Sequence, residues 1–345
     1  MTMLVTGGAG FIGSNFIRHM LTEHPDIPII NLDALTYAGN PESLRGVAEN
    51  PNYTLIKGDI CDTTTVAAIF QNHPIDTVIH FAAESHVDRS ISDGSAFVRT
   101  NVLGTFTLLD CALKHRIRRF IHISTDEVYG SIFEGSFVET DNLNPSSPYS
   151  SSKAGSDLLA RSFFITHGLP VIVTRCTNNY GPYQFPEKLI PLFVTNLLEG
   201  KKVPIYGTGR NIRDWLYVID HCEAILTVLQ KGRIGETYNI GGNSEKQNIE
   251  IVNLICDILD EKAGSLPNGE KRRSLITYVK DRAGHDRRYA IDAAKIRTEL
   301  GWSPSVNFAD GMRRTVEWYL DHKAWIASVT DGSYREYYEK MYGEK

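Results

Sequence analysis

The chain has 345 residues, of which 42% are hydrophobic and 22% charged, and its formal net charge is −5. This composition is ordinary for a globular protein, and the length allows two domains or one large core with a smaller lobe. The acidic balance excludes a general attraction to nucleic acid, so the positive charge that binds any anionic ligand must be local. No apolar run approaches the ~20 residues that span a membrane, and the N-terminus has no signal-peptide pattern, so we expect a cytoplasmic protein.

Cysteine usage agrees with that location. None of the five cysteines forms a C-x-x-C pair, and their spacing matches no zinc site. We therefore expect reduced thiols and no metal site at Cys61, Cys111, Cys176, Cys222 and Cys256.

Strand and helix signals alternate through the first half of the chain. Buried strands are expected over residues 3–6, 28–32, 53–56, 77–81, 119–123 and 171–174. Helices are expected over residues 14–23, 98–115 and 149–167. This alternation predicts an α/β fold, in which a doubly wound parallel sheet of the Rossmann type is covered by helices on both faces.

The second half is less regular and predicts a second, smaller α/β unit. Glycine and prolines make residues 180–191 rich in loops, and a strand is expected over residues 215–218. Asp220 and Glu223 then suit the capping box of a helix. Further helices are expected over residues 248–259 and 308–320, and residues 262–273 are expected to form a polar loop that contains glycine and proline.

A glycine-rich turn follows the first expected strand. Gly7, Gly10 and Gly13 have the spacing of a dinucleotide-binding fingerprint, in which the missing side chains let a pyrophosphate approach the backbone. The helix that begins there would offer N–H groups and a partial positive charge to the phosphates. Asp33 ends the next strand, 20 residues after Gly13, where a carboxylate binds the adenosine ribose. Because an acid there repels a 2′-phosphate, the pattern favours NAD over NADP.

Tyr149 and Lys153 form a Tyr-x-x-x-Lys pair at the start of an expected helix. This spacing places both side chains on one face, where the ammonium is expected to lower the pKa of the phenol from about 10. A phenolate could then accept a hydroxyl proton while hydride leaves the carbon for NAD. Tyr53 and Lys57 have the same spacing but lie on an expected strand, where four residues span about 13 Å, so this pair is set aside.

The fifth expected strand ends in Ser124, Thr125, Asp126 and Glu127. Ligands of open parallel sheets bind beyond the carboxyl ends of the strands. A hydroxyl and two adjacent carboxyls at this place suit acid–base chemistry. Taken alone, however, the motif is more typical of a solvated acidic loop.

Together these motifs resemble the extended short-chain dehydrogenase/reductase family of NAD-dependent epimerases and dehydratases. Five segments resemble its dTDP-glucose 4,6-dehydratase family in particular, namely Asn31–Asn40, Thr125–Gly130, Asn178–Pro182, Pro186–Pro191 and Arg213–Val218. The resemblance runs from Met1 to about Tyr319. It implies a hydro-lyase that converts dTDP-glucose into dTDP-4-keto-6-deoxyglucose and water, for deoxysugar biosynthesis such as that of rhamnose.

The resemblance implies a division of labour among the catalytic residues. Tyr149, supported by Lys153, would deprotonate the 4-hydroxyl of glucose as hydride passes from C4 to NAD, and Thr125 would hydrogen-bond near that hydroxyl. Glu127 would remove the C5 proton, and Asp126 would protonate the departing 6-hydroxyl before hydride returns to C6. Asp126 must then stay protonated, which partial burial beside Glu127 would achieve.

The resemblance also implies two sets of binding residues. NAD is expected to contact Gly7, Gly10, Phe11, Ile12, Gly13, Asp33, Leu35, Thr36, Asp59, Ile60, Ala82, Ala83, Ser85, Thr100, Tyr149, Lys153 and Asn179. The nucleotide sugar is expected to contact Ser85, Thr125, Asn178, Lys188, Leu189, Pro204, Ile205, Tyr206, Arg213, Asn248, Arg282 and His285. Arg213 and Arg282 can clamp a diphosphate, and Tyr206 can line a base pocket.

Domain organisation and assembly follow from the same resemblance. Residues 1–175 with 213–240 would form the NAD-binding Rossmann domain, and residues 176–212 with 241–345 the nucleotide-sugar-binding domain. A homodimer would form through paired helices around residues 98–115 and 152–167. The tyrosines between residues 334 and 342 have no assigned role.

Two alternative functions stay open. Another nucleotide-sugar enzyme would share Tyr149 and Lys153, but an epimerase normally lacks the acid pair, and a GDP-mannose dehydratase or UDP-glucuronate decarboxylase often has serine at position 126. Asp126 therefore favours loss of water from dTDP-glucose. The second alternative is a non-catalytic NAD-binding sensor, which can dispense with the Tyr–Lys pair that this chain keeps.

Overall fold

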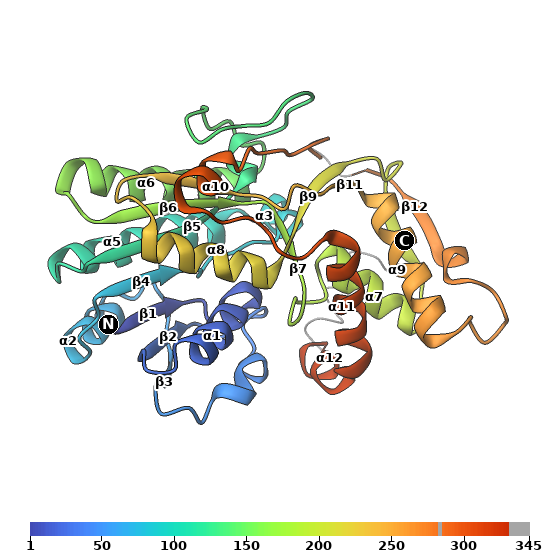
Figure 1. Ribbon diagram of the computed structural model, residues 1–345, viewed down its shortest axis with the longest axis horizontal. Coiled ribbons are helices and arrows are strands. Elements are labelled where there is room, and N and C mark those ends of the chain that lie inside the picture. The colour runs from blue at the N-terminus through green and yellow to red at the C-terminus, as the bar shows by residue number, and fades with distance from the viewer. Residues whose placement is uncertain (282–284, 331–345) are drawn as a thin grey trace.

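The larger part of the molecule is an all-parallel sheet of seven strands (Figure 1). The computed structural model describes residues 1–281 and 285–330. The strand order is β10-β6-β5-β4-β1-β2-β3, and every adjacent pair is parallel. The strands are β1 (Met3–Thr6), β2 (Ile29–Asp33), β3 (Tyr53–Lys57), β4 (Thr77–His80), β5 (Arg119–Thr125), β6 (Val171–Cys176) and β10 (Thr237–Ile240). The predicted doubly wound α/β sheet is confirmed.

Helices cover both faces of this sheet. Successive strand residues point to opposite faces, so Met3 and Val5 of β1 pack in one core and Leu4 packs in the other. The first face carries α1 (Phe11–Glu23), α8 (Val218–Lys231) and α10 (Ala294–Leu300), and the second carries α2 (Thr63–Asn72), α5 (Thr105–Lys114) and α6 (Pro148–His167). Because both faces are packed, the carboxyl ends of the strands are held in fixed positions.

The helix expected over residues 98–115 changes its geometry along its length. A short α4 (Ser95–Phe97) leads into the π-helix η2 (Val98–Gly104), and α5 follows. Asn101 in η2 is buried; its Nδ2 donates to the Glu84 carbonyl and to Ser152 Oγ, and its Oδ1 accepts from the Glu84 N–H. The π turn therefore connects the loop after β4 to the start of α6.

The smaller part of the molecule has its own core. Two small sheets form there, β11-β9-β7 and β12-β8. The elements are β7 (Asn178–Tyr180), β8 (Val203–Tyr206), β9 (Ile212–Tyr217), β11 (Glu245–Gln247), β12 (Ile276–Val279), α7 (Leu189–Leu198), α9 (Asn248–Ala263), α11 (Phe308–Asp321) and α12 (Lys323–Val329). Residues 293–302, which we assigned to this part, pack on a core of the large sheet instead. The division of the chain into two residue sets stays a prediction.

Short helical segments connect these elements, and two local predictions need correction. They are η1 (Pro41–Val47), α3 (Val87–Ser92), η3 (Asp126–Tyr129) and η4 (Arg272–Leu275). The capping box at Asp220 is wrong, because α8 begins at Val218 and Asp220 accepts hydrogen bonds from Ser305 and Val306 of a neighbouring loop. The polar loop at residues 262–273 ends in η4 instead of continuing to Arg273.

Candidate active site

A cavity of about 850 Å³ opens where β1, β2, β4, β5 and β6 end. Its lining includes sixteen of the seventeen residues predicted for NAD, namely Gly7, Gly10, Phe11, Ile12, Gly13, Asp33, Thr36, Asp59, Ile60, Ala82, Ala83, Ser85, Thr100, Tyr149, Lys153 and Asn179. Leu35 is the exception: its N–H donates to Asp33, and its side chain packs against a core of the large sheet. The structure therefore forms a cavity at the strand ends, where the cofactor site was predicted.

The glycine turn after β1 is shaped for a bound phosphate. A Cβ at Gly7 would lie 2.6 Å from the backbone nitrogen of Ala82, and one at Gly13 would collide with the Gly7 carbonyl. Gly10 is different, because its Cβ would meet only the Gly7 carbonyl, at 3.2 Å. α1 begins here with no side chain capping its N–H groups. An open helix N-terminus facing a cavity suits the pyrophosphate of NAD, so the residues present fit this cofactor.

Two aspartates line the same cavity, Asp33 at the end of β2 and Asp59 in the loop after β3. Asp33 Oδ2 accepts from the Ala9 N–H and Oδ1 from the Leu35 N–H, both at 2.8 Å. Burial raises the pKa of Asp33, while these two hydrogen bonds oppose the shift. Asp59 Oδ1 accepts from the Cys61 N–H, and its Oδ2 lies 2.8 Å from Arg99 Nη2. Asp33 is thus held by two backbone N–H groups, and Asp59 by one backbone N–H group and Arg99.

The acid pair follows directly from the end of β5. Thr125 Oγ1 accepts from the Glu127 N–H at 3.3 Å and donates to Asp126 Oδ1 at 3.2 Å. Asp126 is buried, and within the described residues its Oδ2 has no hydrogen-bond partner. Burial raises the pKa of Asp126 well above its usual value, and the Glu127 and Asp214 carboxylates raise it further. This direction agrees with the expectation that Asp126 stays protonated.

Tyr149 and Lys153 lie in the first turns of α6 and line the same cavity as the acid pair. Thr125, Asp126 and Glu127 line this cavity together with Tyr149, so the phenol and the acid pair converge. The predicted lowering of the pKa of Tyr149 is not found, because other groups outweigh any contribution of Lys153. Burial, and then the Glu127 carboxylate, raise that pKa well above its usual value. Lys153 Nζ donates instead to the Ile123 carbonyl at 2.7 Å, and burial lowers the pKa of Lys153 to about 8.

A second cavity of about 160 Å³ adjoins the first. Nine of the residues predicted for the nucleotide sugar line it, namely Asn178, Lys188, Leu189, Pro204, Ile205, Tyr206, Arg213, Asn248 and His285. Ser85 and Thr125 line the larger cavity, and Arg282 lies outside the described residues. Glu127, Asn178, Glu187 and Lys188 line both cavities. One elongated ligand could therefore extend from the acid pair into the second cavity.

The cationic side chains of the second cavity are held by backbone carbonyls. Lys188 Nζ donates to the Ser85 carbonyl at 2.6 Å. Arg213 donates to the Ile212 and Asp286 carbonyls at 2.7 and 2.9 Å, and its guanidinium carbon lies 4.2 Å from the ring centroid of Tyr289. These carbonyls orient both cations in the wall of the cavity, where an anionic ligand could contact them.

Buried acceptors in the same cavity indicate a polar ligand. Within the described part of the chain, Asn178 Oδ1 and Asn248 Oδ1 are buried and have no hydrogen-bond partner. An unpaired buried polar atom is costly, and a ligand that donates to it removes the cost. The two cations and the two buried acceptors in this cavity both fit a nucleotide sugar as the ligand.

Several residues of the cavities were not predicted from the sequence. Glu187 is buried and lines both cavities, and burial raises its pKa. Its Oε2 lies 3.3 Å from Arg89 Nε. Cys176 ends β6 and lines the large cavity, although we expected only an inert thiol there. Its position at a strand end is the same signal that identified Thr125. Trp215 and Tyr289 also line the smaller cavity; Trp215 lies in the family-like segment Arg213–Val218, whereas Tyr289 lies in none of the five segments.

Comparison with known proteins agrees with this geometry. The profile of the GDP-mannose 4,6 dehydratase family matches residues 4–315. A dTDP-glucose 4,6-dehydratase of Xanthomonas campestris pv. campestris (strain B100) is 55% identical over 344 residues, which cover 97% of each chain. The chain belongs to the dTDP-glucose 4,6-dehydratase family. Another member of the family, dTDP-glucose 4,6-dehydratase 1 of Escherichia coli (strain K12), is 52% identical over 99% of each chain.

Solved structures of the family have the same fold. DesIV, the dTDP-glucose 4,6-dehydratase of Streptomyces venezuelae crystallised with NAD and TYD bound, is 51% identical. Its superposition has a TM-score of 0.89 and covers 95% of this chain and 100% of DesIV. Over residues 1–281 and 285–330, no helix combines the length and the apolar character that crossing a membrane requires.

Proposed function

We propose that this chain is an NAD-dependent hydro-lyase that converts dTDP-glucose into dTDP-4-keto-6-deoxyglucose and water. Relatives more than 50% identical along nearly their whole length bear this name. The observation that carries the proposal is that Thr125, Asp126, Glu127, Tyr149 and Lys153 line one cavity together with the glycine turn. A 4-keto-6-deoxyhexose of this kind is an intermediate for deoxysugar pathways, of which rhamnose formation is one.

The glycine turn and the strand ends would hold NAD. The open N-terminus of α1 at Gly10 would bind the pyrophosphate, and Asp33 would accept a hydrogen bond from the adenosine ribose. When bound, NAD accepts the C4 hydride and returns it to C6, and its positively charged nicotinamide favours the phenolate of Tyr149.

Tyr149 is the base for the 4-hydroxyl in this proposal. Its raised pKa means that the phenol is protonated until positive charge favours the phenolate. Lys153 supplies part of that charge from one helical turn away, because with a pKa of about 8 it is mostly cationic at neutral pH. The hydroxyl of Thr125, which lines the same cavity as Tyr149, would position the 4-hydroxyl.

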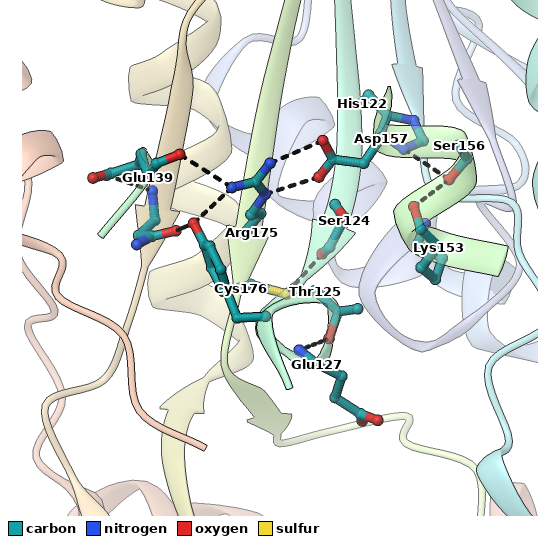
Figure 2. Close-up of polar contacts among 12 residues, drawn as sticks. His122, Ser124, Thr125, Glu127, Glu139, Lys153, Ser156, Asp157, Arg175 and Cys176 are labelled. Carbon is teal, nitrogen blue, oxygen red and sulfur yellow. Dashed lines mark hydrogen bonds and ion pairs between the residues drawn. The ribbon is translucent and has the colours of Figure 1, made fainter. Parts of the chain in front are cut away.

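The acid pair would carry out the loss of water. Glu127 takes the C5 proton, which the 4-keto group has made acidic, and Asp126 gives its proton to the departing 6-hydroxyl. Two adjacent carboxyls can have opposite roles only if their environments differ. Burial supports this difference, because it favours the protonated form of Asp126, while Glu127 extends away from the buried contacts (Figure 2).

The second cavity would bind the nucleotide half of the substrate. Lys188 and Arg213 face the diphosphate in this proposal, and Tyr206, Pro204 and Asn248 surround the base. A sister nucleotide-sugar enzyme would bind in a similar way, but Asp126 supports the dehydratase because loss of water needs an acid. A non-catalytic sensor would have no use for the convergence of Tyr149 with the acid pair.

The function can be tested directly with purified protein. We expect dTDP-glucose to give a 4-keto product, seen as an absorbance that develops in alkali, without added NAD if the cofactor copurifies. The same assay with UDP-glucose, GDP-mannose and CDP-glucose is the control. Turnover of one of these sugars without turnover of dTDP-glucose would reject the proposed substrate.

We further propose a cytoplasmic homodimer. Free thiols at all five cysteines support a reducing compartment. Exposed apolar side chains on η2, α5 and α6 support a dimer interface, namely Val98, Leu103, Phe106, Leu158 and Ile165. We expect a dimer in sedimentation experiments and a monomer when Leu158→Glu and Ile165→Glu are combined. A wild-type monomer would reject the interface.

A further inference from the structure

A buried arginine connects the elements that carry the two catalytic pairs. Arg175 lies in β6, and its side chain is 3% exposed. Its Nε and Nη2 donate to the two carboxylate oxygens of Asp157, at 2.8 and 3.0 Å. Asp157 lies on α6, four residues after Lys153, so the two side chains are on one face of the helix. This bidentate pair therefore ties β6 to the helix that carries Tyr149 and Lys153.

The third nitrogen of the same guanidinium holds η3. Arg175 Nη1 donates to Tyr129 Oη at 2.7 Å and to the Glu139 carbonyl at 3.3 Å. Figure 2 shows Arg175 between Asp157 on one side and Glu139 on the other. Tyr129 is the last residue of η3, the segment that begins with Asp126 and Glu127. One side chain thus bonds both the helix of the Tyr–Lys pair and the segment of the acid pair.

Tyr129 is itself fixed to the edge of the sheet. Its hydroxyl donates to Asn239 Oδ1 at 2.9 Å, and its ring stacks on Phe137 with centroids 5.1 Å apart and planes inclined by 11°. Asn239 lies in β10, and its Nδ2 donates to the carbonyls of Phe137 and Asp292. The contact between Arg175 and η3 therefore has little freedom to move.

These contacts do not reach a ligand. Arg175, Asp157 and Tyr129 are not among the residues that line either cavity. A buried ion pair contributes little net stability compared with apolar side chains of similar volume, whereas the planar fork of arginine fixes geometry. The arrangement is therefore better explained by positioning than by stabilisation of the core.

We propose that Arg175 is a positioning residue that sets the spacing between the acid pair on η3 and the Tyr149–Lys153 pair on α6. The proposal rests on the function proposed above. Oxidation at C4 uses the α6 pair, whereas loss of water uses the η3 pair on the same bound sugar. A displacement of about 1 Å can slow a reaction by up to ~100-fold, so loosening one side of Arg175 should slow one step more than the other.

The test removes each side of the contact in turn. Tyr129→Phe deletes the hydroxyl that bonds Arg175 but keeps the ring on Phe137. We expect it to slow the loss of water about 10-fold while C4 oxidation changes less than about 2-fold. Asp157→Asn breaks the bidentate pair on the α6 side, and we expect it to slow C4 oxidation more than the loss of water.

The measurement is a single turnover of the NAD-loaded protein with dTDP-glucose. The absorbance of reduced nicotinamide reports C4 oxidation by its rise and the later steps by its decay, so Tyr129→Phe should make this absorbance accumulate and persist. Thermal unfolding of each variant provides a readout besides activity. A purely structural role would lower the unfolding temperature and slow both steps together.

Tyr238→Phe is the matched control. Tyr238 lies beside Asn239 in β10 and is fully buried. Its hydroxyl accepts a hydrogen bond from the Arg233 N–H and donates one to Glu299 Oε2, and none of these residues lines either cavity. We expect its two rates to stay within about 2-fold of wild type. Equal slowing of both steps in Tyr129→Phe, or no change in either, would overturn the positioning role. Wild-type protein that fails to turn over dTDP-glucose would instead reject the proposed function.

Discussion

The two cavities are lined by different parts of the fold. The larger one lies at the ends of strands in a sheet packed on both faces, and its lining combines the glycine turn with side chains that follow the strands. The smaller one is lined by side chains from α3, α7, β8, β9 and the start of α9, with Lys188 and Arg213 held by backbone carbonyls. The comparison suggests that chemistry depends on the rigid sheet, whereas recognition depends on side chains that can be exchanged. Substitutions in the larger cavity should therefore affect rate, and those in the smaller one affinity.

Tyr149→Phe should have the largest effect. Without the phenolic proton acceptor, C4 oxidation should fall by ~10³-fold or more, because general-base catalysis contributes about 10²–10⁴. Single-turnover absorbance of reduced nicotinamide measures this step. Oxidation that persists at near the wild-type rate would remove Tyr149 from its proposed role.

Asp126→Asn should have the next largest effect. Asparagine keeps the shape of the protonated acid but cannot give up a proton, so we expect loss of water to slow about 100-fold with little change in C4 oxidation. Reduced nicotinamide should therefore accumulate in a single turnover. Equal slowing of both steps would contradict the separation of roles between Asp126 and Tyr149.

Arg213→Lys tests the smaller cavity. Lysine keeps the charge but loses the fork and the contact with the Tyr289 ring, so the KM for dTDP-glucose should rise about 10-fold while kcat changes little. Steady-state kinetics gives both constants. A fall in kcat with an unchanged KM would mean that the smaller cavity takes part in the chemistry.

The pH profile should show the smallest effect. Burial lowers the pKa of Lys153 to about 8, so its positive charge is present below that pH and is lost as the pH rises through it. The rate of C4 oxidation should therefore fall several-fold above about pH 8. In Lys153→Arg, which stays charged, this alkaline decrease should disappear. A decrease that is unchanged in Lys153→Arg would assign it to another group.

Residues at strand ends could be placed from the sequence. Asp33, Thr125 and the glycine turn follow short apolar runs, and in a parallel sheet the carboxyl ends of all strands meet at one edge. The structure brings these residues into one cavity for that reason. Cys176 satisfies the same rule, and it was missed only because cysteine was considered for metals and disulfides alone.

Features that depend on tertiary contacts could not be placed in this way. The raised pKa of Tyr149 comes from burial and from Glu127, neither of which the Tyr-x-x-x-Lys spacing encodes. Pro204 and Asn248 come from separate elements, and only a family resemblance connected them. Asp220 resembled a capping residue locally but bonds a loop 85 residues away.

The π-helix η2 restricts how this protein can change in length. A π turn contains one residue more than an α turn, and each residue rotates a helix by about 100°. Deleting one residue within Val98–Gly104 would restore a regular helix and turn Asn101 away from Glu84 and Ser152. The loop before η4, residues 264–271, lines neither cavity. We therefore expect related chains to differ in length at residues 264–271 and to keep the same residue count through η2.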